Sequence, residues 1–76
     1  MLERIIEILE EIRDNVDYTM EDQLVDGGIF DSFDIVALVG ELKSEFDVEI
    51  GIEDLTPENF NSAETICNLV KRLQDE

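Results

Sequence analysis

The chain has 76 residues, of which 21 are Asp or Glu and 5 are Lys or Arg, so its formal net charge at pH 7 is -16. This imbalance excludes nucleic acid as a ligand, because phosphates are neutralised by clustered Lys and Arg, and it predicts partners with basic surfaces. The length allows one small core, so we expect a single domain over residues 1–76, and a hydrophobic content of 43% excludes a disordered acidic tail.

The first predicted element is an amphipathic helix at the N-terminus. Its apolar residues recur at spacings of three and four, which places them on one face, while acids occupy the opposite face. The apolar face comprises Leu2, Ile5, Ile6, Leu9, Ile12 and Val16. Asp14 and Asn15 compete for backbone hydrogen bonds, so the helix should fray there. A long loop over residues 17–31 follows, and we expect it to be ordered because Leu24, Val25, Ile29 and Phe30 give it apolar anchors.

A second helix is predicted to begin at Asp31 or Ser32, where a short polar side chain can accept a hydrogen bond from the first-turn amides. An acid at Asp34 suits the positive end of that helix. The core stripe is Ile35, Leu38, Val39, Leu42 and Phe46, and the acids Asp34, Glu41 and Glu45 are expected to point away from it. A neighbouring apolar stripe of Phe33, Val36, Ala37 and Gly40 is expected to be partly exposed.

The C-terminal third contains two further helices. Residues 47–51 have the pattern of a short strand, and Thr56 followed by Pro57 indicates a short third helix with proline at its first position. The final helix opens at Asn61 or Ser62, directs Ile66, Leu69, Val70 and Leu73 inward, and ends near Lys71 and Arg72. The fold class is therefore all-α: a small antiparallel four-helix bundle, with three main helices, a short third helix and a long loop between the first two.

Ser32 stands where the loop turns into the second helix, in the segment Gly27-Gly28-Ile29-Phe30-Asp31-Ser32. A nucleophilic serine in acyl transfer needs a base, usually histidine, and this chain has no histidine. We therefore interpret Ser32 as a residue that receives a group from another enzyme. Taken alone, a serine at a helix start is ordinarily a cap.

The motif Asp31-Ser32-Phe33-Asp34, followed by Val36, Leu38-Val39, Leu42 and Glu45-Phe46, resembles the signature of acyl and peptidyl carrier proteins along nearly the whole chain. The resemblance implies a helical carrier that does no chemistry itself. In that family the serine is esterified with 4′-phosphopantetheine, whose thiol holds an acyl or aminoacyl group as a thioester; the matching residue is Ser32. Phe33 stands where leucine is common, which bears on the cargo.

The resemblance also implies partners: a phosphopantetheinyl transferase, a loading enzyme and downstream transferases. Asp31 and Asp34 would help to position the modifying enzyme. The residues expected to dock partners are Phe33, Val36, Glu41 and Glu45. Three cargo classes stay open: fatty or polyketide acyl groups, amino acids of a nonribosomal pathway, and D-alanine for cell-wall polymers. The rival interpretation is an unmodified acidic adaptor in which Ser32 is a plain cap.

No run approaches the ~20 apolar residues of a membrane span, and the N-terminus lacks the pattern of a signal peptide, so we expect a cytoplasmic monomer. The single cysteine, Cys67, cannot form an internal disulfide and is expected to fill the core. No metal site is predicted. Cys67 lacks histidine or a second cysteine as a zinc partner, and the acid-rich segment 47–53 has its glycine one place too early for an EF-hand.

Overall fold

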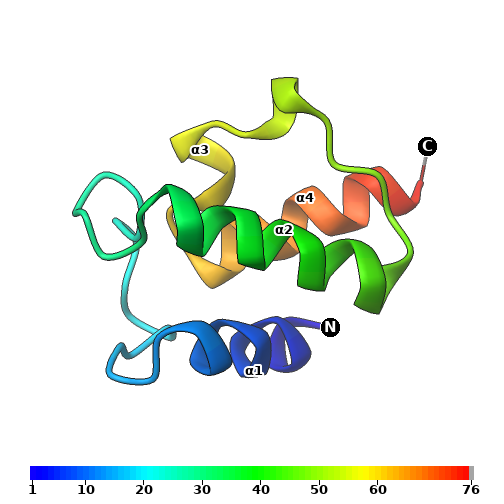
Figure 1. Cartoon of the computed structure of the whole chain (residues 1–76). Coiled ribbons are helices and arrows are strands. Elements are labelled where there is room, and N and C mark those ends of the chain that lie inside the picture. The colour runs from blue at the N-terminus through cyan, green and yellow to red at the C-terminus, as the bar shows by residue number, and fades with distance from the viewer. Residues whose placement is uncertain (76) are drawn as a thin grey trace.

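The computed structural model describes residues 1–75, which form four α-helices and one 3₁₀ turn. The α-helices are α1 (Leu2–Ile12), α2 (Ser32–Phe46), α3 (Pro57–Phe60) and α4 (Ala63–Gln74), and the 3₁₀ turn η1 covers Ile52–Asp54. Helix α1 runs opposite to both α2 and α4, which share a direction because the segment 47–62 carries the chain back along the bundle (Figure 1). The predicted all-helical bundle with a long first connection is confirmed.

The core lies between α1, α2 and α4, with α3 packed against α4. Each main helix contributes side chains that are fully or almost fully shielded from water, and this apolar burial is the main stabilising term of such a small fold. They include Ile5, Ile8 and Leu9 of α1, Leu38 and Leu42 of α2, and Ile66, Leu69 and Val70 of α4. Cys67 is buried among them, as expected for a core filler.

Helix α1 ends at Ile12, two residues before the predicted fraying point. The buried hydroxyl of Tyr18 donates a shared hydrogen bond to the carbonyl oxygens of Leu9 and Arg13, and Arg13 is already extended. Burial raises the pKa of Tyr18 to about 12. The half-buried Val16 therefore packs on the core from the loop and not from α1.

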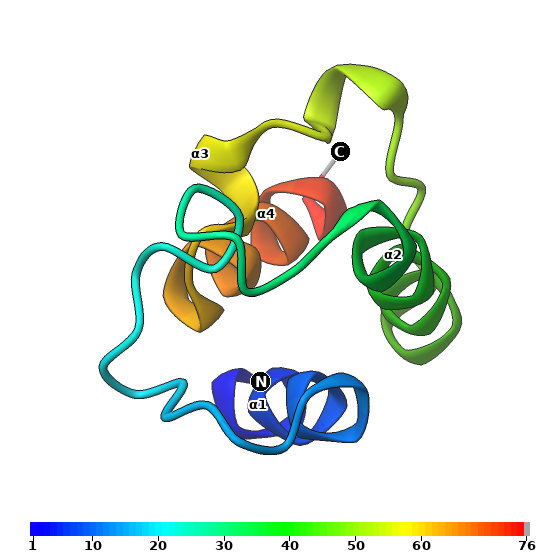
Figure 2. The same ribbon diagram turned by 60° about the vertical axis from the view of Figure 1, so that its left-hand side comes forward.

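The loop between α1 and α2 is packed, as predicted, because Leu24 and Phe30 are buried. It is attached to the α3–α4 junction, beside which it lies in Figure 2, by Asn61. The Asn61 side-chain oxygen accepts hydrogen bonds from the amides of Val25 and Asp26, both at 3.0 Å. Its amide nitrogen donates to the Asp26 carboxylate at 2.9 Å, and its backbone carbonyl accepts from the Leu24 amide.

Two local expectations are settled by hydrogen bonding. The cap of α4 is Ser62, whose hydroxyl accepts a hydrogen bond from the Thr65 amide, and this leaves Asn61 for the loop. Residues 47–51 form no strand, although they had the pattern of one. Val48 and Ile50 do face the core and Glu49 does not, but the part of the chain that the structure describes offers no second strand to pair with.

Candidate functional site

Ser32 is the first residue of α2 and is exposed. The cap is Asp31, whose side-chain oxygen accepts a hydrogen bond from the Asp34 amide at 2.9 Å, while Asp34 accepts one from the Asp31 amide at 3.1 Å. This reciprocal capping box satisfies the amides of Asp31 and Asp34 without the Ser32 hydroxyl. The sequence left the start of the helix open between Asp31 and Ser32, and the structure assigns capping to Asp31.

The carboxylate of Asp34 faces α1 and is not part of an outward acidic face, which corrects the expectation that it points away. Its oxygen Oδ2 lies 3.1 Å from Arg13 Nε and 2.9 Å from Arg13 Nη2, and its side chain is only 14% exposed. Burial opposes ionisation of Asp34, but the hydrogen bonds from the Asp31 amide and from Arg13 outweigh it and lower the pKa.

The other predicted docking residues fall into two groups. Glu45 also faces α1, because Arg4 Nη2 donates to its Oε1 at 3.0 Å, so it too differs from the expected outward orientation. Glu41 is exposed, as expected. Phe33 and Val36 keep 83% and 70% of their surface exposed, so the stripe on which they lie is more open than the sequence indicated.

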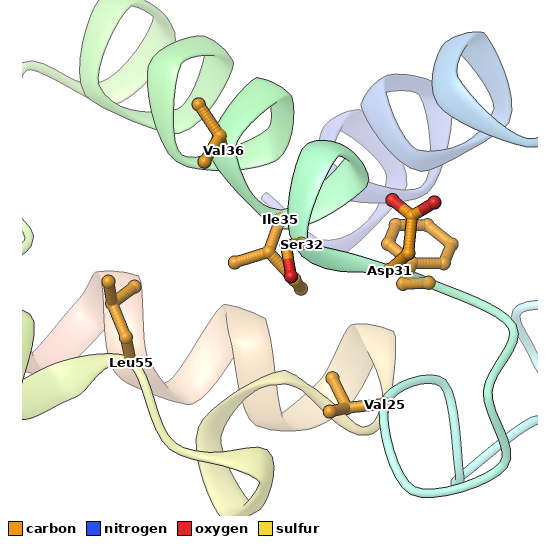
Figure 3. A pocket seen from close by; sticks show the side chains of 7 residues that line it. Val25, Asp31, Ser32, Ile35, Val36 and Leu55 are labelled. Atoms are coloured by element: carbon orange, nitrogen blue, oxygen red, sulfur yellow. The ribbon is translucent and has the colours of Figure 1, made fainter.

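A pocket of about 480 Å³ adjoins Ser32. Its walls are mostly apolar and come from the loop, from α2 and from the residue after η1: Val25, Phe30, Asp31, Ser32, Ile35, Val36 and Leu55. Figure 3 shows the Ser32 hydroxyl directed into the space between α2 and the side chains of Val25 and Leu55. The Asp31 carboxylate points away from this space in the same view.

A second pocket, of about 240 Å³, shares three of these walls and extends toward α3, where Pro57 and Phe60 line it. Sequence reasoning assigned neither Val25 nor Leu55 to the site. Val25 was interpreted only as a loop anchor, and the 43% exposure of Leu55 has no local sequence signal. Val25 and Leu55 are distant from Ser32 in the sequence or lie on another segment, and the folded chain brings all three to the same pocket.

This arrangement suits a hydroxyl that receives a group. The chain has no histidine that could act as a base. The carboxylates of Asp31 and Asp34 each accept a hydrogen bond from the other residue's backbone amide, so no side chain of the site is placed to take the Ser32 proton. Exposure on the first turn of a helix makes the hydroxyl accessible to the active site of another protein. Within residues 1–75, no three or more Cys, Asp or Glu residues gather as metal ligands.

None of the helices in residues 1–75 combines the length and hydropathy needed to cross a membrane. No protein-family model matches the chain. Curated relatives do match: the D-alanyl carrier protein of Streptococcus suis is 33% identical over 72 residues, and those of Streptococcus sanguinis and Streptococcus thermophilus are 32% identical over the same length. Each alignment covers 93% of this chain and 91% of the relative.

Proposed function

Because the chain belongs to the acyl carrier protein family, we propose that it carries D-alanine as a thioester on 4′-phosphopantetheine attached to Ser32. The carrier role follows from the family, and the names of the relatives support the cargo. The geometry of Ser32 supports its assignment as the attachment site, because its hydroxyl is exposed, is not used for capping and is directed into a mostly apolar pocket.

The residues around Ser32 fit this prosthetic group. Its phosphate is an anion, and Ser32 lies at the positive end of the fifteen-residue helix α2. The arm beyond the phosphate is partly apolar and matches the walls contributed by Val25, Ile35 and Leu55. When bound, the group supplies the thiol that holds the cargo. The chain itself orients the hydroxyl and leaves the chemistry to its partners.

The proposed partners are a phosphopantetheinyl transferase, a loading enzyme and an acceptor enzyme, each with a basic surface. The exposed Phe33 and Val36 would supply the apolar centre of the docking surface, with Glu41 and Asp31 as exposed acids beside it. Glu45 already binds Arg4 of α1, and Asp34 binds Arg13 just beyond its end, so both acids would act in docking less directly than the sequence suggested. The monomeric state and cytoplasmic location stay predictions that sedimentation and cell fractionation can check.

Incubation with coenzyme A and a phosphopantetheinyl transferase tests the attachment site. Mass spectrometry should show one added phosphopantetheinyl group, and peptide mapping should place it on Ser32. Ser32→Ala should fold normally, since Asp31 is the cap, and should stay unmodified. Ser62 serves as an internal control, because it caps α4 and should remain free. A wild-type chain that stays unmodified would support the unmodified acidic adaptor instead.

A fatty acyl cargo is the second candidate, and the mostly apolar pocket beside Ser32 favours it. The two cargoes can be compared by loading the carrier from D-alanyl and octanoyl coenzyme A and measuring the melting temperature. A group that binds only the folded state raises its stability, so an octanoyl chain held in the pocket should raise the melting temperature. A D-alanyl carrier should show no gain in melting temperature from the octanoyl group. It should also be loaded by a purified enzyme that activates D-alanine with ATP.

A further inference from the structure

Arg13 joins the end of α1 to the turn that contains Ser32. A single carboxylate oxygen, Asp34 Oδ2, accepts three hydrogen bonds. Two come from Nε and Nη2 of Arg13, at 3.1 and 2.9 Å, and the third comes from the Asp31 amide at 3.1 Å. In the other half of the capping box, the Asp34 amide donates a hydrogen bond to the side-chain oxygen of Asp31. Arg13 thus holds the carboxylate that closes this turn, although it lies 21 residues from Asp34 in the sequence.

Arg13 is itself fixed on the bundle. Its amide donates to the Leu9 carbonyl at 2.9 Å, and its carbonyl accepts from the buried Tyr18 hydroxyl. The Tyr18 ring packs edge-on against Phe30, with 6.3 Å between ring centroids. Phe30 directly precedes Asp31, so the turn is attached to the end of α1 on both sides of Ser32.

We infer that Arg13 is a positioning residue for modification of Ser32: it keeps the first turn of α2 in one conformation so that the hydroxyl is presented in a single place. This inference rests on the proposed attachment at Ser32. The first turn of a helix is prone to fray, and group transfer is sensitive to how the acceptor atom is oriented. Charge-assisted hydrogen bonds from a planar guanidinium fix geometry more firmly than a neutral partner would.

The role is separable from stability. The Arg13 side chain is 48% exposed, and the Asp34 carboxylate, at 14% exposed, keeps the Asp31 amide as a second partner, so loss of this partly water-exposed ion pair should change the free energy of unfolding little. Removal of Arg13 should therefore affect the presentation of Ser32 more than the fold. Arg4 provides a matched control, since it also links α1 to α2, through Glu45 at 3.0 Å, but at the far end of α2.

Arg13→Gln and Arg4→Gln each remove one positive charge, so they change the net charge of the chain equally. The unmodified proteins are compared by transfer kinetics at Ser32, by hydrogen exchange of the Asp31 and Asp34 amides, and by urea unfolding. Arg13→Gln should lower kcat/KM at least about threefold relative to Arg4→Gln, mainly through kcat. The two amides should exchange about fivefold faster in Arg13→Gln alone. Arg13→Lys, which keeps the charge but has no fork of donors, should restore only part of both losses.

The outcomes separate this inference from the proposed function. If the wild-type chain is not modified, the attachment at Ser32 is wrong. If the wild type is modified and Arg13→Gln matches Arg4→Gln in kcat/KM, the positioning role is wrong. Slower transfer with unchanged exchange of both amides also overturns it, because Arg13 would then act by contacting the transferase.

Discussion

Asn61→Ala should lower the free energy of unfolding by about 2 kcal/mol, a large loss for a residue on a short connection. The substitution removes two hydrogen bonds accepted from the Val25 and Asp26 amides and one donated to the Asp26 carboxylate. A hydrogen bond contributes a net ~1 kcal/mol, and less where water can replace it. The half-buried Val25 amide accounts for about 1 kcal/mol, and the two more exposed bonds to Asp26 together account for about the same.

The size of this loss should be easy to measure. A domain of this length has a total stability of about 4–11 kcal/mol, and each kcal/mol shifts the melting temperature by about 4–8 °C. Asn61→Ala should therefore melt about 10 °C below the wild type. Asn68→Ala is the control, because Asn68 is exposed on α4 and alanine favours helix there.

Urea unfolding followed by circular dichroism gives the free energies directly. A change within about 0.5 kcal/mol of the wild type would refute the reasoning, since it would mean that water replaces all three bonds without loss. Asn61→Asp adds a second measurement. The new carboxylate keeps both acceptor bonds but repels Asp26, so its stability should be lowest at neutral pH and should recover on acidification.

Four further outcomes follow from the structure. Gly27→Ala should destabilise by about 1–3 kcal/mol, because its Cβ would lie 2.5 Å from the Gln23 carbonyl oxygen. Gly40→Ala should stabilise by about 0.5–1 kcal/mol in the same thermal melts, because an added Cβ inside α2 meets nothing within 4 Å. Burial opposes ionisation of Asp34, but its hydrogen bonds to a backbone amide and Arg13 lower its pKa. The stability that it supplies is thus present above the ordinary pKa of about 3.9 and lost as pH falls through the lowered value; Asp34→Asn should flatten this acid limb in urea titrations. Added salt or magnesium should raise both the melting temperature and the KM of the transferase, because it screens repulsion within a chain of charge -16 and also attraction to basic partners; a fall in either would contradict this account.

The helices could be predicted because their information is local. Spacings of three and four mark the buried faces of α1, α2 and α4, and Pro57 marks the first position of α3. The position of Ser32 at a helix start follows in the same way from the short polar residues that precede α2. The packing of the loop was also foreseeable, because apolar residues in a polar segment need a core to bury them.

The contacts around the site could not be predicted, because each joins distant segments. The sequence predicts an outward-pointing acid at Asp34, but the fold brings Arg13 into contact with it. The sequence also allows Asn61 as a helix cap, but in the fold its side chain binds the loop. The end of α1 was placed two residues too late for the same reason, since the Tyr18 hydroxyl binds the carbonyls of Leu9 and Arg13 from outside the helix. Side-chain pairing over 21 or 36 residues leaves no periodic trace in the sequence.

The basic residues have a further consequence for how the sequence can change. Among residues 1–75, four of the five form ion pairs, and three of these join different elements: Arg4 and Arg13 link α1 and its C-terminal end to α2, and Arg72 links α4 to η1. Because acids are so numerous, the loss of one relieves repulsion. A second acid can also remain as the ion-pair partner of the basic residue, as Glu7 and Glu45 both pair with Arg4. The loss of a base removes a link and increases the charge imbalance at once. For stability alone, substitutions at exposed acids should therefore be neutral or beneficial, whereas substitutions at the linking arginines should each have a small cost.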